Sequence, residues 1–317
     1  MGAKTSSIVA SQSIYKKMLI IGGCELSLER NPHDTVEVLD DQNKVEYLGQ
    51  NSLLPVRGPM AHIYNNKIYL FGGCTGPKQH IDTIQIYDLL LNQWSIAPFK
   101  MINGRSCFML SNIESEVYIL GGYNGYECLR EVEKIDLSQD NPQSVILKNL
   151  YHPVKNGYSF YDPIKQIIYI IGGWDEKETQ DKIFSYNPKT QEMAFVSYLP
   201  HKVEGHSLVQ IDNFLYIFGG FDGYSVTDTI IRVDLKYMTS EVVQGCKLKY
   251  KRENSTSQIL NGNTIIVAGG WNGNSSMDSM EVFKYDFDKK TLSREDNIDE
   301  NLVKLQSIRN RPCSVAL

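Results

Sequence analysis

The chain has 317 residues, of which 42% are hydrophobic and 22% are charged, and its formal net charge is −5. This composition is that of a globular domain, and the acidic balance argues against nucleic acid as a partner, because binding to phosphates requires a basic surface. No apolar run approaches the roughly 20 residues that a helix requires to cross a bilayer.

The chain begins MGAKTSS, which fits the pattern M-G-x-x-x-[ST] with Gly2 and Ser6. This motif predicts N-myristoylation of Gly2, and an unmodified start is the alternative. One acyl chain binds a membrane only marginally, so we expect membrane association only if Gly2 is acylated. The start lacks the apolar core of a secretory signal, and the six cysteines show neither C-x-x-C nor zinc-finger spacing. We therefore expect a cytoplasmic protein with reduced thiols.

From about residue 15 onward, one pattern recurs: a short apolar strand that ends in two adjacent glycines. The first glycines of the six pairs are separated by 50, 49, 51, 47 and 50 residues, which is an internal repeat. We assign all twelve glycines a structural role, because only glycine tolerates both positive φ and close approach by a neighbouring chain. They are Gly22, Gly23, Gly72, Gly73, Gly121, Gly122, Gly172, Gly173, Gly219, Gly220, Gly269 and Gly270.

Each unit contains three further strand patterns. One precedes the diglycine strand, a third follows a polar loop, and a fourth follows a turn. The third strand ends in an acid or amide, which can bond its own backbone and start the turn: Asp40, Asp88, Asp136, Asn187, Asp234 and Asp286. Each unit is therefore a four-stranded antiparallel meander. Six such units favour radial packing, so we predict an all-β, six-bladed β-propeller over residues 15–317.

The last residues, RNRPCSVAL from Arg309 to Leu317, resemble the first strand of a unit, such as RGPMAHI. We predict that this C-terminal segment completes blade one beside KMLIIGG and so closes the ring. Residues 1–14 would then form a flexible tail. The alternative is that SSIVASQS, from Ser6 to Ser13, occupies the same place.

The repeat resembles the kelch motif. The likeness rests on the diglycine, on Tyr-Asp at the end of a third strand, and on Trp94 in a fourth strand, and it extends over residues 16–317. Met193 and Leu292 stand where two other units would have the Trp. The resemblance implies a protein-interaction scaffold, since similar proteins bind actin or present substrates to cullin ubiquitin ligases, and we expect a monomer. Those adaptors carry a BTB or F-box module, for which this chain has no room, so a ligase role would require a separate partner.

The segments before the first strands and the loops after the diglycines should open on one face. Basic residues precede the first strands: Arg57, Arg105, Lys155, Lys202, Arg252, Arg309 and Arg311. Aromatic residues follow the diglycines: Tyr123, Tyr126, Trp174, Tyr224 and Trp271. We predict that these residues ring the channel mouth and bind a partner with an acidic motif, Arg57 and Arg105 foremost, because a guanidinium grips a carboxylate with two bonds. The alternative is that the arginines hold loop backbones between blades and the aromatic rings pack between blades.

An enzyme is the other reading of this family. Kelch propellers include secreted copper oxidases, sialic-acid epimerases and iron-dependent specifier proteins. The export signal of the first two and the E-x-x-x-D-x-x-x-H motif of the third are not found. Only His201 and His206 lie close together, which is a weak metal signal. We expect no metal and no cofactor, with a sugar epimerase or metal-dependent enzyme acting at the channel mouth as the alternative.

Overall fold

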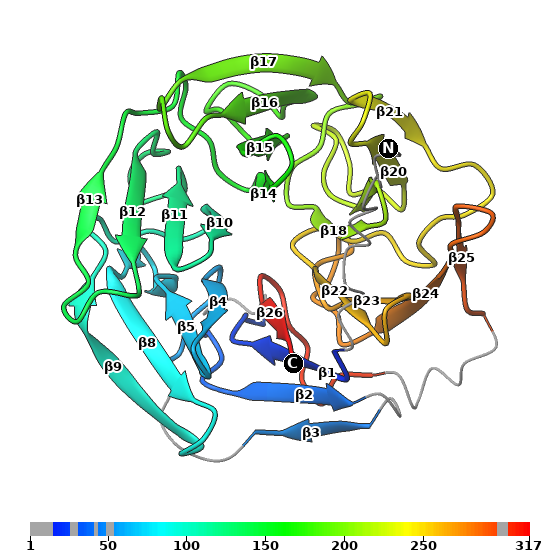
Figure 1. Ribbon diagram of the computed structural model, residues 1–317. Coiled ribbons are helices and arrows are strands. Elements are labelled where there is room, and N and C mark those ends of the chain that lie inside the picture. The colour runs from blue at the N-terminus through cyan, green and yellow to red at the C-terminus, as the bar shows by residue number, and fades with distance from the viewer. Residues whose placement is uncertain (1–14, 26–30, 41–43, 49–53, 297–303) are drawn as a thin grey trace, which may run out of the picture.

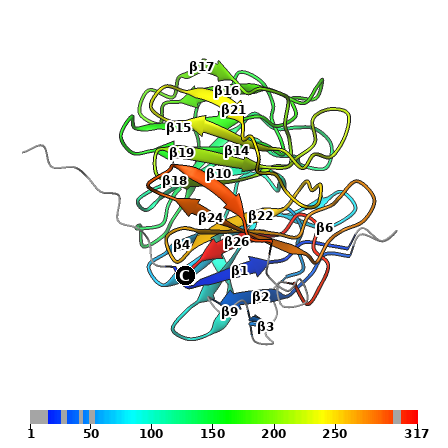
Figure 2. The ribbon, with the colours of Figure 1, turned by 90° about the vertical axis from the view of Figure 1, so that its right-hand side faces the viewer.

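The computed structural model describes residues 15–25, 31–40, 44–48, 54–296 and 304–317. They form six four-stranded antiparallel sheets arranged around a central axis (Figure 1). The predicted six-bladed β-propeller is confirmed. Figure 2 shows the ring from its edge. Gly2, the predicted tail of residues 1–14 and the alternative closing segment lie outside the described residues. Within the described residues, no helix has the length and apolarity that crossing a bilayer requires.

Blades 1 to 3 are each built from four strands, named from the innermost strand outward. Blade 1 contains β26 (Cys313–Ala316), β1 (Lys17–Ile21), β2 (Val36–Asp40) and β3 (Val45–Tyr47). Blade 2 contains β4 (Met60–Tyr64), β5 (Lys67–Phe71), β8 (Thr83–Asp88) and β9 (Gln93–Lys100). Its loop forms a two-stranded sheet of β6 (Cys74–Gly76) and β7 (Gln79–His80). Blade 3 contains β10 (Met109–Ile113), β11 (Glu116–Leu120), β12 (Val132–Asp136) and β13 (Ser144–Ile146).

The other three blades follow in chain order around the ring. Blade 4 contains β14 (Tyr158–Asp162), β15 (Ile167–Ile171), β16 (Lys182–Tyr186) and β17 (Met193–Tyr198). Blade 5 contains β18 (Ser207–Ile211), β19 (Phe214–Phe218), β20 (Ile230–Asp234) and β21 (Thr239–Val242). Blade 6 contains β22 (Thr256–Leu260), β23 (Thr264–Ala268), β24 (Met280–Asp286) and β25 (Thr291–Arg294).

The ring is closed by the C-terminal strand, as predicted. β26 pairs antiparallel with β1, from Met18 opposite Ala316 to Ile21 opposite Cys313. The backbone N–H of Leu317 donates to the carbonyl of Lys17 at 2.8 Å and extends this pairing by one residue. In Figure 1 the red β26 lies beside the blue β1, on the channel side of blade 1.

The diglycine strands are apolar on both faces because each is packed between two neighbouring blades. In β1, Leu19 and Ile21 pack against Ile68 and Leu70 of β5, while Met18 and Ile20 pack against the side of blade 6. This explains why KMLII and KIYLF read as continuous apolar runs rather than as alternating patterns, since a strand covered on both faces has no polar side. These inter-blade clusters are the hydrophobic core.

The acid or amide at the end of each third strand starts a turn, as predicted. In blade 2, Asp88 Oδ1 accepts the backbone N–H groups of Leu90 and Leu91 at 2.9 and 3.0 Å. In blade 5, Asp234 Oδ1 accepts those of Lys236 and Tyr237 at 2.8 and 3.1 Å. The short polar side chain thereby fixes the hairpin between the third and fourth strands.

The diglycines bring neighbouring blades into backbone contact. Gly219 has φ +59°, and a Cβ on it would lie 2.2 Å from the carbonyl oxygen of Arg252 in the next blade. The N–H of Gly220 donates to that same carbonyl at 2.8 Å. The predicted structural role of the glycines thus has two causes at Gly219, the left-handed backbone and the close approach of another chain segment.

We expect Gly219→Ala to lower the free energy of unfolding far more than Gly245→Ala. Both glycines have positive φ, but Gly245 has nothing within 4 Å of its Cβ position. The matched substitution at Gly245 therefore carries only the left-handed strain of about 1–2 kcal/mol. At Gly219 the clash with Arg252 adds about 1–3 kcal/mol. Urea unfolding of the two variants measures the difference, and equal losses would show that the close contact is not rigid.

Candidate functional site

One end of the channel is tightened by a closed ring of six backbone hydrogen bonds, which we call the amide ring. Each member lies just before the innermost strand of its blade and donates its N–H to the carbonyl of the member in the preceding blade, at 2.5–3.0 Å. All six have left-handed φ, between +54° and +62°. The members are Gly58, Cys107, Asn156, Gly205, Asn254 and Arg311.

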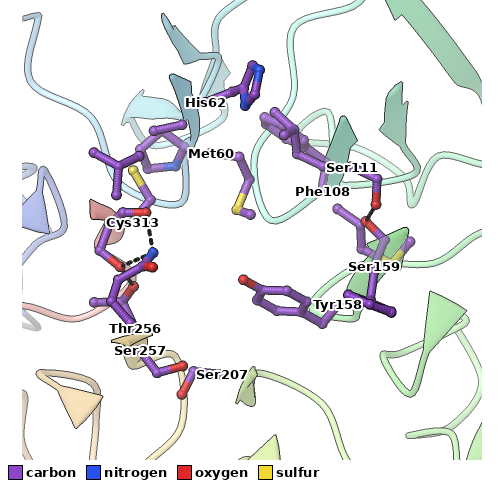
Figure 3. A pocket seen from close by; sticks show the side chains of 18 of the residues that line it. Met60, His62, Phe108, Ser111, Tyr158, Ser159, Ser207, Thr256, Ser257 and Cys313 are labelled. Atoms are coloured by element: carbon purple, nitrogen blue, oxygen red, sulfur yellow. Dashed lines mark hydrogen bonds between the residues drawn. The ribbon is translucent and has the colours of Figure 1, made fainter. Parts of the chain in front are cut away.

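From the amide ring inward, along the innermost strands, the channel contains a cavity of about 710 Å³ (Figure 3). Its wall mixes apolar side chains such as Met60 and Tyr158 with hydroxyls, and the Ser111 hydroxyl donates to that of Ser159 at 2.8 Å. Burial lowers the pKa of His62 to about 4, so its imidazole is neutral at pH 7. Among the residues that the structure describes, no three His, Cys, Asp or Glu side chains gather in a way that could hold a metal ion.

Three of the predicted site residues are buried between blades and not at the mouth: Arg105, Arg252 and Arg309 have no exposed surface. Each forms an ion pair with a buried glutamate at the start of the third strand of its own blade: Arg105–Glu133, Arg252–Glu281 and Arg309–Glu37. Arg252 also donates through Nη1 to the carbonyl of Gly269 at 2.8 Å.

The backbone of the same residue holds the preceding blade. The carbonyl of Arg252 accepts the N–H of Gly220, and the carbonyls of Arg105 and Arg309 accept those of Gly73 and Gly270. Each arginine therefore ties two blades together, through its side chain on one side and its carbonyl on the other. For these three residues the structure agrees with the alternative interpretation, in which arginines hold loop backbones. Arg105, a residue expected to be foremost at the mouth, is one of them.

Arg57, Lys155 and Arg311 lie at the channel mouth, and none of them forms an ion pair with a described carboxylate. The Arg57 Nη2 donates to Cys74 Sγ at 3.3 Å, and the Arg311 Nη1 donates to Cys107 Sγ at 2.8 Å. Lys155 Nζ lies 4.7 and 4.6 Å from the ring centroids of Tyr123 and Trp174. Such cation–π contacts hold the ammonium group without neutralising its charge.

The remaining predicted residues lie on the loops. Lys202 forms an ion pair with Glu178. Tyr126 and Tyr224 are 79% and 92% exposed at the tips of tight turns, and the turn of Tyr224 is fixed by Asp222 Oδ1, which accepts its N–H at 2.8 Å. Trp271 is half-buried and bonds through its backbone to Glu253. The predicted cationic and aromatic residues are therefore spread over three places: between blades, at the mouth and on loop tips.

Two acidic residues complete the mouth, and neither was predicted from the sequence. Glu204 and Glu253 occupy the same place in blades 5 and 6 that Arg57 and Lys155 occupy in blades 2 and 4, one residue before the amide ring. Thr179 Oγ1 donates to the carboxylate of Glu204 at 3.0 Å. Burial raises the pKa of Glu253 to about 7, opposed by the Arg311 charge and reinforced by Glu204. The mouth is therefore cationic on one side and acidic on the other.

We expect Glu253→Gln to stabilise the propeller at pH 8 more than at pH 5. The native carboxyl keeps its proton up to about pH 7, whereas in the unfolded chain it loses it near 4.5. The native state binds more protons in this interval, so the free energy of unfolding falls as pH rises through it. The variant lacks this penalty, and thermal melts of both proteins at the two pH values measure it. A difference in Tm that stays constant with pH would contradict the burial of this charge.

Comparison with known proteins agrees with the repeat and the fold. The family model described as Attractin/LZTR1 beta-propeller matches residues 18–223, which is more than half of the chain. The chain belongs to that family. Kelch-repeat propellers are commonly protein-interaction domains, and the kelch likeness seen in the sequence is confirmed by the relatives.

The relatives are longer proteins. A kelch repeat-containing protein of Dictyostelium discoideum is 32% identical over 38% of this chain and 22% of its own length. Kelch-like protein 23 of Pongo abelii is 27% identical over 70% of this chain and 38% of its own length. Spermatocyte protein spe-26 of Caenorhabditis elegans is 25% identical over 80% of this chain and 44% of its own length. The matched region thus spans less than half of each of these relatives.

Proposed function

We propose that this propeller is a non-catalytic protein-interaction module whose channel mouth binds a carboxylate-bearing segment of a partner protein. The observation that carries the proposal is the state of the mouth cations. Arg57 faces the Cys74 thiol and Lys155 faces the rings of Tyr123 and Trp174, whereas the arginines between the blades are paired with glutamates.

A carboxylate is the ligand that suits these cations best. The Arg57 Nε–H is buried and has no acceptor among the described residues. A buried donor without a partner costs about 1–3 kcal/mol, which a carboxylate would offset if the Arg57 side chain turned to expose this N–H. The planar guanidinium also offers a second parallel N–H, so the contact would be directional as well as charged.

The acidic side of the mouth gives the bound segment an orientation. Glu204 would repel a carboxylate placed over blade 5, and Glu253 would do the same over blade 6 once it loses its proton near pH 7, because like charges at short range in a partly buried site are costly. The partner segment therefore carries its acid over blades 2 to 4 and a neutral or basic group over blades 5 and 6. The exposed Tyr126 and Tyr224 offer aromatic contacts further out, as such residues often do in interfaces.

Partner capture with two charge-matched variants tests this proposal. The mouth variant combines Arg57→Gln with Lys155→Gln. The control combines Lys100→Gln with Lys247→Gln, which removes the same charge from exposed lysines paired with Asp82 and Asp228. We expect quantitative mass spectrometry to find one partner set with the wild type and the control, and its loss with the mouth variant, while all three proteins keep a similar Tm. Retention of the full partner set by the mouth variant would rule out this binding site.

A further inference from the structure

Cys107 and Arg311 are the two unusual members of the amide ring. The other four positions hold glycine or asparagine, the residues that best tolerate a left-handed backbone. Cys107 and Arg311 have the same left-handed φ, and the Arg311 side chain reaches Cys107 across the ring member between them, Gly58. A Cβ on Gly58 would lie 3.1 Å from Cys107 Sγ. The contact between the two side chains therefore depends on glycine at position 58.

The surroundings of the Cys107 sulfur are rich in donors and positive charge. Arg311 Nη1 donates to Sγ at 2.8 Å, and the Ser106 hydroxyl donates to it at 3.6 Å. Burial by itself raises the pKa of the Cys107 thiol, but the Arg311 charge, the Ser106 bond and the Lys155 charge outweigh it and hold the pKa below its ordinary value. These contacts stabilise the thiolate, which is the nucleophilic form of cysteine.

Cys107 borders the space inside the channel. The residue is half-buried and lines the channel cavity of about 710 Å³, which is large enough to admit hydrogen peroxide. Cys246 is also half-buried, but burial raises the pKa of its thiol above the ordinary value. Cys246 therefore serves as a second half-buried thiol whose pKa is shifted in the opposite direction.

We propose that Cys107 is a site of oxidative modification, at which a thiolate held by Arg311 reacts with hydrogen peroxide to form a sulfenic acid. The sulfur attacks one peroxide oxygen, an S–O bond forms and the O–O bond breaks. The sulfur loses two electrons, and the released hydroxide takes a proton from solvent to become water. The product replaces the thiolate that now faces Arg311, so the modification changes the charge balance of the channel mouth.

Brief exposure of the native protein to hydrogen peroxide, followed by dimedone trapping and peptide mapping, tests the proposal. We expect Cys107 to be trapped at least about tenfold faster than Cys246 at pH 7, because the rate follows the thiolate fraction. Arg311→Gln should slow Cys107 and move the midpoint of its pH–rate profile upward, while the Cys246 profile stays in place. Trapping of Cys107 no faster than Cys246, or an unchanged midpoint in Arg311→Gln, would overturn the proposal.

Cys107→Asn is the control for folding. Asparagine occupies the equivalent ring positions 156 and 254, so this variant should keep the amide ring and the wild-type Tm. We expect it to lose the fast-trapping peptide and no other. If the fast-trapping peptide persists in this variant, the reactive thiol is a different cysteine and the assignment to Cys107 is wrong.

Discussion

A chain that ends at Pro312, and so lacks β26, is expected to lose the cooperative unfolding transition of the propeller. The truncation removes the strand that pairs with four residues of β1, from Met18 to Ile21. It also removes the buried side chains of Cys313 and Val315, which pack between blades 1 and 2. Lost hydrogen bonds of about 0.5–1.5 kcal/mol each and lost apolar burial of about 1.5–3 kcal/mol per large side chain sum to the order of 5–10 kcal/mol. This is comparable to the whole stability of a typical domain.

Differential scanning calorimetry of the truncated chain measures this effect. The control is a chain that begins at Tyr15, which removes the alternative closing segment, Ser6 to Ser13, and keeps β26. We expect the control to melt as the full-length protein does, because closure is provided by the C-terminal strand. A normal transition in the truncated chain together with a destabilised control would mean that the N-terminal segment closes the ring instead.

The substitution Arg252→Val is expected to have the second-largest effect, a loss of about 3–5 kcal/mol in the free energy of unfolding, because it leaves a buried carboxylate unpaired. The pair with Glu281 is 2.7 Å long, and neither side chain is more than 4% exposed. Arg252 Nη1 also donates to the carbonyls of Gly269 and Ser279, which would lose this donor. Urea unfolding measures the loss.

Blade 2 supplies the compensating change for this variant. It has Val56 where blade 6 has Arg252, and Gln85 where blade 6 has Glu281. The Gln85 side chain accepts the Leu54 N–H at 2.6 Å, as Glu281 accepts the Lys249 N–H. The double variant Arg252→Val with Glu281→Gln should therefore regain at least about half of the lost stability. A double variant no more stable than Arg252→Val would show that the loss does not come from the unpaired charge.

The fold could be predicted because its determinants are local and repeated. The diglycine marks the place where two blades meet, the acid at the end of the third strand marks a turn, and the apolar second strand marks the core. The closing strand was predictable because Arg309 to Leu317 resembles the start of a unit. The amide ring was not predictable in this way, since it depends on six separate segments reaching the same level of the channel.

The site could be predicted less well than the fold, because the basic residues before the first strands occupy two adjacent positions with different orientations. Arg105, Arg252 and Arg309 lie two residues before the amide-ring member of their blade. Arg57 and Lys155 lie one residue before it. In an extended segment a step of one residue turns the side chain to the opposite side. The first position faces the interior between blades, and the second faces the mouth.

A signal in the sequence separates these two classes. Three units have arginine two residues before the amide-ring member, and these units have glutamate as the second residue of the third strand. The other three units have valine two residues before the amide-ring member, and a neutral residue at the second or third residue of the third strand. The glutamates are Glu37, Glu133 and Glu281, and the neutral residues are Gln85, Phe184 and Ile231. These six residues lie 12 to 15 residues after the first glycine of the pair in their units, because the loops differ in length, so the pairing appears only when the third strands are aligned. The pattern of basic residues could not predict Glu204 and Glu253, which are acidic residues at the same position as Arg57 and Lys155.

Selection of a random peptide library on the immobilised propeller tests most directly whether the mouth cations recognise a carboxylate. The same selection is made on the Arg57→Gln, Lys155→Gln variant after its Tm has been shown to match the wild type. We expect the peptides enriched on the wild type to carry Asp or Glu and to lose binding to the variant. Enriched peptides without acidic residues, or equal binding to both proteins, would contradict recognition of a carboxylate at the channel mouth.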